Sequence, residues 1–233
     1  MKKKKNVKVE ETVKIEKDEK IDKNKAVSID EAVKIIKEAK KAKFDESVEI
    51  HIKLGIDPKK GDQMVRSTAV LPHGIGKTKK IAVITADDNQ KEAQNAGADI
   101  VGGKEMIEKI KTSGKVNFDV LVATADVMKD LAKIAKILGP RGLMPSPKNE
   151  TITNNISKTV EELKKGKISF KNDDTSNIHQ IIGKISFTEN QLVENFKAFI
   201  DEIKKAKPSS SKGTYMKNIV ICSTMGKGVR VNV

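Results

Sequence analysis

A glycine-rich loop, Gly74-Ile75-Gly76-Lys77-Thr78, is the first place in this sequence where residue types and spacing suggest chemistry. Its Gly-Lys-Thr ending matches the end of the phosphate-binding loop G-x-x-x-x-G-K-[ST], in which backbone N–H groups hold nucleotide phosphates. The first glycine of that pattern would fall on Leu71. The loop also precedes an apolar run, whereas a phosphate-binding loop follows a strand and opens a helix. The residues therefore favour a flexible hinge that presents lysines, and they do not favour a nucleotide site.

Two further loops have residue types suited to nucleic-acid contact. Gly139-Pro140-Arg141-Gly142 matches the G-x-x-G clamp of KH domains, but that clamp joins two helices and a proline-rich stretch follows here, so a structured turn is favoured. Ser223-Thr224-Met225-Gly226 ends a predicted strand, where hydroxyls, a thioether and a glycine can approach a sugar-phosphate surface. A simple glycine turn explains the same four residues, and the local sequence leaves both interpretations open.

The sequence contains no pattern typical of a catalytic or metal site. Cys222 is the single cysteine, and His51, His73 and His179 do not have metal-ligand spacing. Cys222 also lacks a glycine-rich elbow, so we expect a buried thiol on a strand and not a nucleophile. We therefore expect no enzyme activity, no metal and no cofactor. Because an apolar signal-peptide core and a run of about 20 apolar residues are both missing, a cytoplasmic protein is expected.

The charge of the chain indicates a polyanionic partner, either nucleic acid or an acidic membrane surface. The sequence has 46 Lys and Arg against 32 Asp and Glu, a net charge of +14, and its pI is about 9.6. Only three of the basic residues are arginines, namely Arg66, Arg141 and Arg230. Because lysines attract phosphates as point charges and not through bidentate forks, base-edge reading by arginine is limited.

The two ends of the chain share one pattern of strands and helices. Residues 1–25 alternate Lys with Glu and Asp and are expected to form a flexible tail. An S-x-x-E capping box at Ser28 predicts a helix over 28–42, and a Thr188/Gln191 capping pair predicts another from Thr188. Apolar alternation and β-rich composition predict strands at 47–54, 65–71, 167–171, 178–187 and 215–222.

The middle of the chain has a different rhythm. Apolar strands predicted at 81–85, 99–101 and 118–123 alternate with helices predicted at 89–96, 105–111 and 126–138. Such alternation indicates a parallel sheet with helices on both faces, so 75–166 is predicted to form a Rossmann-like three-layer α/β/α domain. We expect this domain to be inserted into a split α+β domain formed by 26–74 and 167–233. The two crossings would form a hinge at Gly74, Gly76 and Gly166.

Several longer motifs, taken together and in order, identify a family. They are Leu54-Gly55-Ile56-Asp57-Pro58, Leu71-Pro72-His73-Gly74, Ala123-Thr124-Ala125-Asp126-Val127-Met128, the stretch from Ile137 to Lys148, and Ser223-Thr224-Met225-Gly226. The chain resembles the large-subunit ribosomal protein one family of the bacterial type, the stalk protein beside the ribosomal exit site. The resemblance covers about residues 27–233. Its most specific part is the signature loop that contains Gly139, Pro140, Arg141, Gly142 and Pro145.

The resemblance implies a function and a set of contacts. A member of this family is expected to bind large-subunit rRNA, to assist release of deacylated tRNA at the exit site, and to repress translation of its own operon mRNA. It is expected to be a monomer when free of the ribosome. The RNA-contacting positions that the resemblance implies are Lys43, Phe44, Asn172, Asp173, Thr175, His179, Ser223, Thr224, Met225 and Gly226.

Two departures and two alternatives accompany this interpretation. Residues 1–25 differ from the Arg- and Tyr-bearing start common in the family, and Asp174-Thr175-Ser176-Asn177 replaces a turn that usually contains Lys and Gly. The alternatives are a nucleotide-binding enzyme that uses the middle domain, and a non-specific RNA chaperone with a basic tail. Nucleotide turnover would indicate the first, and equal binding to structured and random RNA would indicate the second.

Overall fold

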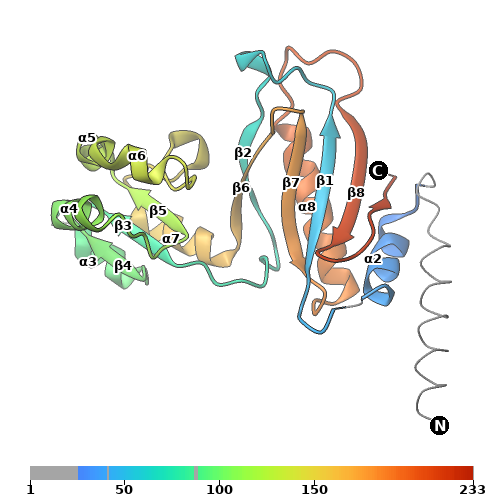
Figure 1. Ribbon diagram of the computed structural model, residues 1–233, viewed down its shortest axis with the longest axis horizontal. Coiled ribbons are helices and arrows are strands. Elements are labelled where there is room, and N and C mark those ends of the chain that lie inside the picture. The colour runs from blue at the N-terminus through green and yellow to red at the C-terminus, as the bar shows by residue number, and fades with distance from the viewer. Residues whose placement is uncertain (1–25, 41, 87–88, 233) are drawn as a thin grey trace, which may run out of the picture. The chain divides into compact units, whose positions relative to one another are not determined.

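The computed structural model of the chain (Figure 1) describes residues 26–40, 42–86 and 89–232. The flexible tail predicted at 1–25 lies outside the described residues. The chain forms two compact units, one from the residues up to Val65 together with those from Phe170 onward, and one from Arg66–Ser169. The structure is mixed α/β, as the sequence predicts at that level. None of the helices in the described part is long and apolar enough to cross a bilayer.

The first unit is built on a four-stranded sheet with the order β7-β1-β8-β9. Its strands are β1 (Ser47–Leu54), β7 (Asn177–Lys184), β8 (Met216–Ser223) and β9 (Val229–Arg230). β1 pairs antiparallel with both β7 and β8. The alternation predicted for β1 is observed, because Val48, Ile50, Ile52 and Leu54 are all almost completely buried. The intervening side chains of β1 therefore lie on the opposite face, which is partly exposed.

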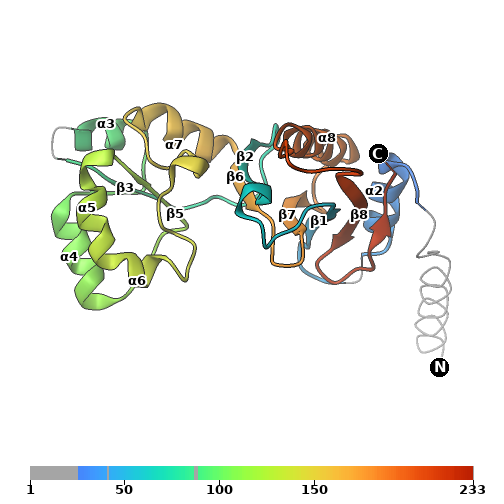
Figure 2. The same ribbon diagram turned by 90° about the horizontal axis from the view of Figure 1, so that it is seen from above.

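Two capped helices accompany this sheet, and Figure 2 shows α8 along one of its faces. α2 (Ile29–Glu38) begins at a complete capping box of Ser28 and Glu31, and α8 (Glu189–Lys205) begins at one of Thr188 and Gln191. Both boxes confirm the predicted helix starts. α2 ends before the predicted position 42. The strand predicted at 178–187 was too long, because β7 ends at Lys184 and a turn follows in which Phe187 N–H donates to the Lys184 carbonyl.

A second, two-stranded sheet pairs β2 (Arg66–Val70) with β6 (Lys167–Lys171). Both strands agree with the predicted ones to within one residue at each end. A short 3₁₀ helix, η1 (Gly61–Gln63), precedes β2. Val65 and Asn172 exchange backbone and side-chain hydrogen bonds within the first unit.

The second unit contains a parallel sheet with the order β4-β3-β5. Its strands are β3 (Ile81–Ile84), β4 (Ile100–Gly102) and β5 (Val120–Ala123). Alternate residues of β3 belong to two separate apolar clusters, so both faces of the sheet are covered. One cluster includes α4 (Lys104–Ser113), and the other includes α3 (Gln90–Asn95) and α7 (Ile156–Lys165).

Two helical regions of this unit differ from the prediction. The single helix predicted at 126–138 alternates instead between 3₁₀ and α turns, as η3 (Ala125–Val127), α5 (Met128–Leu131), η4 (Ala132–Ile134) and α6 (Ala135–Leu138). The tighter 3₁₀ turn has three residues per turn and keeps Leu131 and Ile134, three apart, buried on the same side. α7 was not predicted, although Asn155 caps its start by accepting a hydrogen bond from Lys158 N–H at 3.3 Å.

Candidate nucleic-acid interface

The predicted RNA-contacting residues form two groups at opposite ends of β1 in the first unit. The Ser47 end of β1 lies beside the end of β8, whereas Lys53 pairs with Asn177 at the start of β7. Six residues of strand, at roughly 3.3 Å each, separate these ends by about 20 Å. The group at the Ser47 end is Lys43, Phe44, Ser223, Thr224, Met225 and Gly226, and the group at the Lys53 end is Asn172, Asp173, Thr175 and His179.

A buried carboxylate, Glu46, organises the group at the Ser47 end. Its side chain is 1% exposed, and its two oxygens accept hydrogen bonds from Ala42 N–H at 3.2 Å and Met225 N–H at 3.1 Å. Burial alone would raise the pKa of Glu46, but the hydrogen bonds from Ser223, Met225 and Ala42 outweigh it and lower the pKa. Glu46 therefore joins the segment before β1 to the loop after β8. Sequence reasoning missed it, because an acid before a strand is not distinctive.

The loop after β8 is held in place by its own polar groups. Thr224 Oγ1 accepts a hydrogen bond from Ser47 N–H at 3.1 Å and donates to the Ser47 carbonyl at 3.3 Å. Ser223 is buried, and a methyl group added to Gly226 would lie 2.4 Å from Ser223 Oγ. Three of the four residues in this predicted contact loop therefore have structural roles that fix its shape.

Two apolar side chains of this group remain exposed to solvent. Phe44 is 53% exposed and Met225 is 67% exposed. The segment that carries Phe44 is fixed on its other side by Asp45, which accepts hydrogen bonds from Ser186 N–H at 3.1 Å and Ser186 Oγ at 2.9 Å. Exposed apolar side chains on rigid loops are suited to stacking on, or packing against, a folded partner.

A closed turn around Asp173 forms the group at the Lys53 end. Asp173 Oδ1 accepts hydrogen bonds from Thr175 N–H at 2.9 Å and Asn177 N–H at 2.6 Å, and Oδ2 accepts from Thr175 Oγ1 at 2.7 Å. Burial alone would raise the pKa of Asp173, but these hydrogen bonds together hold it well below its usual value. Ser176 occupies the left-handed position of the turn at φ +66°. The carboxylate therefore shapes a turn that lacks glycine.

Asn172, predicted to contact RNA, is buried in the structure. Its Oδ1 accepts a hydrogen bond from Val65 N–H at 2.8 Å, and its Nδ2 donates to the Asp173 carbonyl at 3.0 Å. Thr175 and His179, by contrast, are exposed. Asn172 thus positions the Asp173 turn from inside the unit.

A row of polar side chains crosses the partly exposed face of the sheet. His51 and His179 stand opposite each other on β1 and β7, with their Nδ1 atoms 2.7 Å apart. His51 Nε2 lies 3.1 Å from Cys222 Sγ on β8, and His179 Nε2 lies 3.6 Å from Asp173 Oδ2. Burial, then the charge of His179, lowers the pKa of His51. No grouping of three or more metal-ligating side chains occurs among the described residues.

Comparison with known proteins identifies the family. A family model described as the ribosomal protein L1p/L10e family matches residues 36–227. This chain belongs to that family. A curated relative, large ribosomal subunit protein uL1 of Solibacter usitatus, is 49% identical over 198 residues, which cover 85% of this chain and 84% of that protein.

Membership of the L1 family settles the class of protein. Family members are structural, non-enzymatic proteins of the ribosome, so this chain is a ribosomal, RNA-binding protein of the cytoplasm. The expectation that it is not an enzyme is confirmed by the family. The alternative of a nucleotide-dependent enzyme is therefore excluded.

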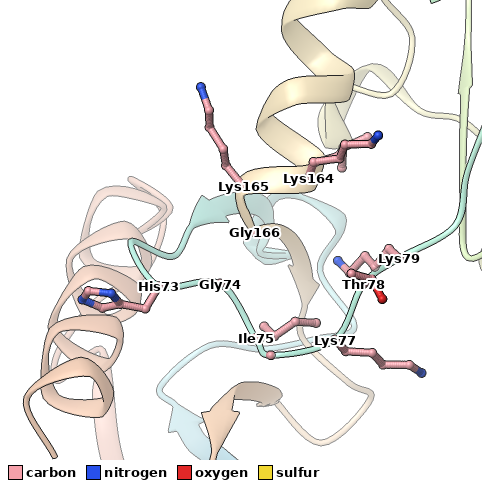
Figure 3. A pocket seen from close by; sticks show the side chains of 11 residues that line it. His73, Gly74, Ile75, Lys77, Thr78, Lys79, Lys164, Lys165 and Gly166 are labelled. Carbon is pink, nitrogen blue, oxygen red and sulfur yellow. The ribbon is translucent and has the colours of Figure 1, made fainter. Parts of the chain in front are cut away.

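The glycine-rich loop of this L1-family chain lines a pocket of about 310 Å³ in the second unit (Figure 3). Gly74, Gly76 and Gly166 all have positive φ, and a methyl group on Gly166 would lie 2.5 Å from Gly74 Cα. Figure 3 shows the side chains of Lys77, Lys164 and Lys165 pointing in different directions. The loop leads into a strand, β3, and the lysines around the pocket do not converge, so the loop lacks the geometry of a phosphate-binding loop.

The signature loop is also part of the second unit. Gly139, Pro140, Arg141 and Gly142 are exposed, whereas Leu143 and Met144 pack against one of the two apolar clusters. The loop continues into a 3₁₀ turn, η5 (Pro147–Asn149), where a KH clamp would continue into a second helix. Thr151 closes it, because its Oγ1 accepts from Ser146 N–H at 2.9 Å and donates to the Ser146 carbonyl at 3.2 Å.

Proposed function

We propose that this chain binds large-subunit rRNA through its first unit and forms the mobile stalk at the ribosomal exit site. In this proposal the residues 26–74 and 167–233 form the RNA-binding domain, and 75–166 form an inserted Rossmann-like domain that moves on Gly74, Gly76 and Gly166. Membership of the family supports the rRNA partner. The two-face covering of the parallel sheet supports the proposed architecture.

The observation that carries the proposal is that exposed apolar side chains lie on segments held in place by hydrogen bonds. Phe44 and Met225 are exposed on segments that the buried Glu46 joins through hydrogen bonds. Structured RNA is recognised largely by shape, and unstacked bases stack on aromatic side chains. A preorganised loop loses little conformational freedom on binding, so more of the contact energy appears as affinity.

The charge of the protein adds a second, less selective contribution. Lys43 and Lys227 are exposed close to the apolar pair in sequence, and the whole chain has a net charge of +14. Contacts between lysines and phosphates weaken as salt concentration rises, whereas stacking and shape complementarity depend much less on salt. We therefore expect selectivity for the correct RNA to persist at salt concentrations that remove non-specific binding.

The test is a titration of the full chain with an rRNA stalk-junction fragment and with an unrelated duplex of equal length, over a range of salt. Phe44→Ala and Met225→Ala remove the exposed apolar pair, and Met64→Ala is the matched control because Met64 is also 53% exposed in the first unit. Loss of one stacked base costs about 1–3 kcal/mol, so Phe44→Ala is expected to weaken junction binding by about 5- to 150-fold. Met64→Ala should bind as the unaltered protein does.

Equal and steeply salt-dependent binding to both RNAs would instead support the non-specific RNA chaperone.

The repression of the operon mRNA that the family resemblance implies is tested separately, by translation of that message in a cell-free system. Repression should be relieved by added junction fragment and reduced by Phe44→Ala, because the same surface would bind both RNAs. Binding of deacylated tRNA at the exit site is tested by tRNA release from ribosomes assembled with and without the chain.

A further inference from the structure

We propose that the signature loop and the η5 turn after it form a second RNA-binding surface, in which Arg141 at the tip of the loop contacts an RNA phosphate. Both segments belong to the second unit and follow α6 in Figure 2. RNA binding in the proposed function involves only the first unit, so the signature loop has no role in it. The inference goes beyond that function, and it rests only on the RNA-binding class that the family shows.

The chain around this loop is cationic over a long stretch. Residues 131–149 contain no Asp or Glu, but they include four basic residues. These are Lys133, Lys136, Arg141 and Lys148. Lys133 pairs with Asp130 at 2.7 Å. The other three are exposed, and none of them forms an ion pair with a carboxylate in the part of the chain that the structure describes.

The carboxylates on either side of this stretch already have cationic partners. Asp130, before it, has oxygens 2.7 Å from Lys133 Nζ and 3.6 Å from Lys104 Nζ, and the hydrogen bond from Lys133 lowers the pKa of Asp130. Glu150, after it, accepts a hydrogen bond from Lys167. The exposed cations between these two acids therefore remain available to an anionic partner.

Arg141 lies at the tip of a closed turn. Gly142 N–H donates to the Gly139 carbonyl at 3.0 Å, so Pro140 and Arg141 occupy the two central positions. Gly142 has φ +68°, and nothing lies within 4 Å of a methyl group added to it. Because Gly142 has no side chain, an RNA backbone can approach the turn closely. The Arg141 guanidinium can then donate two parallel hydrogen bonds to one phosphate.

A buried lysine fixes the base of this surface. The Lys167 side chain is 6% exposed, and its Nζ donates to Glu150 and, at 2.7 Å, to Glu162 of α7. Burial alone would lower the pKa of Lys167, but the two carboxylates outweigh it and raise the pKa, so the ammonium stays charged. Glu150 has φ +54°, which is strained for a residue with a Cβ. Strain of this kind persists only where the surroundings fix it, and it is common at functional sites.

η5 is also attached to β2, and this attachment adds a second arginine. Arg66 Nε donates to Asn149 Oδ1 at 3.0 Å, next to Lys148 in the sequence. Two of the three arginines in the chain, Arg66 and Arg141, therefore lie on this surface or against it. Arginine recognises phosphate at two points, whereas lysine attracts it as a point charge. This concentration of arginine favours phosphate as the ligand.

The chemistry of the surface fits RNA better than a protein partner. Protein interfaces are centred on apolar and aromatic side chains that are exposed before binding. The large exposed apolar side chains of the described residues all lie outside 131–149, and they are Phe44, Met64, Val70 and Met225. Within the loop, Leu143 and Met144 pack inward against an apolar cluster. The cations and backbone that remain exposed are the groups that contact phosphates.

The first experiment compares two variants that lose the same charge from opposite faces of the β4-β3-β5 sheet. Arg141→Gln removes the cation at the tip of the loop. Lys91→Gln removes an exposed cation of α3, which packs on the other apolar cluster. Each full chain is titrated with the rRNA stalk-junction fragment and, separately, with deacylated tRNA, over a range of salt. Thermal unfolding checks that both variants are folded.

Arg141→Gln is expected to weaken binding to at least one of these RNAs by about fivefold at low salt, because one unit charge about 4 Å from a phosphate contributes roughly that factor in water. It should also make the slope of log affinity against log salt shallower by about 0.7–0.9. Lys91→Gln should bind as the unaltered chain does. A loss with the junction fragment alone, or with tRNA alone, supports the surface and identifies its RNA. Equal effects in the two variants, or none in Arg141→Gln, would overturn the proposal.

The second experiment observes the arginine in the unaltered chain. The chain has only three arginines, so their side-chain Nε–H signals can be followed by NMR, and the Arg141→Gln variant assigns that of Arg141. The Arg141 signal is expected to shift and to saturate as RNA is added, and to shift less with the same concentration of inorganic phosphate. Equal shifts would mean that the loop binds an adventitious ion only. A signal that neither RNA moves would exclude the contact.

The outcomes separate this inference from the proposed function. Selective junction binding with no effect of Arg141→Gln on either RNA contradicts the second surface and leaves the first-unit proposal intact. Failure to prefer the junction, together with a loss in Arg141→Gln that Lys91→Gln does not show, contradicts the first-unit proposal and supports the second surface.

Discussion

Glu46 accepts a hydrogen bond from the backbone N–H of Met225, 179 residues along the chain, while it is itself almost completely buried. The same carboxylate accepts from Ala42 N–H, so one side chain determines the relative placement of two loops. Neither loop is part of a regular element at this point. Two exposed apolar residues of the first unit, Phe44 and Met225, therefore depend on an acid that does not itself face solvent.

Glu46→Gln is expected to reduce both stability and RNA affinity. An amide keeps one acceptor oxygen but places an N–H₂ group against a backbone N–H, which leaves a buried donor without a partner. Such a loss costs about 1–3 kcal/mol, and urea unfolding followed by circular dichroism measures it. Glu38→Gln on the exposed side of α2 is the control and should change stability by less than about 0.5 kcal/mol. An unchanged unfolding midpoint in Glu46→Gln would show that the two loops do not depend on this carboxylate.

Acid is expected to destabilise the chain through the carboxylates with lowered pKa values. Asp173 and Glu46 have folded-state pKa values below the ordinary values of 3.8 and 4.5. Below about pH 4.5 the unfolded chain therefore binds more protons than the folded one, so the stability present at higher pH is lost as pH falls. Unfolding by urea between pH 7 and pH 3 measures this slope. Asp173→Asn should flatten it, and an equal slope in that variant would assign the acid sensitivity to other groups.

Gly166→Ala is expected to destabilise the second unit more than a matched glycine substitution does. Gly166 has φ +110°, and an added methyl would lie 2.5 Å from Gly74 Cα. Gly114 has φ +64° with nothing within 4 Å of an added methyl. Gly114→Ala should therefore cost only the left-handed strain of about 1–2 kcal/mol, and Gly166→Ala about 1–3 kcal/mol more from overpacking. Thermal unfolding compares the two, and equal losses would mean that the backbone at Gly166 relaxes freely.

Ser176 provides a test in which glycine is expected to be more stabilising than alanine. Its φ of +66° is strained for any residue with a Cβ, while its Oγ donates to the Ile56 carbonyl at 2.9 Å. Ser176→Ala loses the hydrogen bond and keeps the strain, whereas Ser176→Gly loses both. We expect the glycine variant to be more stable than the alanine variant by about 1–2 kcal/mol in urea unfolding. The reverse order would show that the turn changes its conformation when the hydroxyl is removed.

Elements with local signals could be predicted from the sequence. Both capping boxes and the alternation of β1 depend on residues that are close in sequence. They appear in the structure where the pattern predicts them. The prediction of one continuous helix at 126–138 was wrong in detail. The choice between 3₁₀ and α turns depends on how Leu131 and Ile134 pack in the apolar cluster against the sheet. α7 also had local signals, with Asn155 before it and Gly166 after it, that the sequence reasoning did not use.

The roles of individual site residues were harder to predict, because they depend on partners far along the chain. Asn172 and Thr175 are both polar residues of one turn, yet Asn172 is buried against Val65 and Thr175 is exposed. Nothing in the neighbouring sequence distinguishes Glu46 from other acids, because its role depends on the two loops that it joins. The pairing of His51 with His179 requires the register of β1 and β7, which no single segment specifies.

Because the hydroxyl of Thr224 both donates to and accepts from the Ser47 backbone, the proposed interface predicts two genetic classes of variants that fail to bind RNA. Substitutions at Thr224 or Gly226 act through the shape of the loop, so a second-site change that stiffens the first unit can suppress them. Substitutions at Phe44 or Met225 would remove the proposed contacting surface itself and leave the loop intact. No gain in stability can restore that surface, so their suppressors must arise in the RNA.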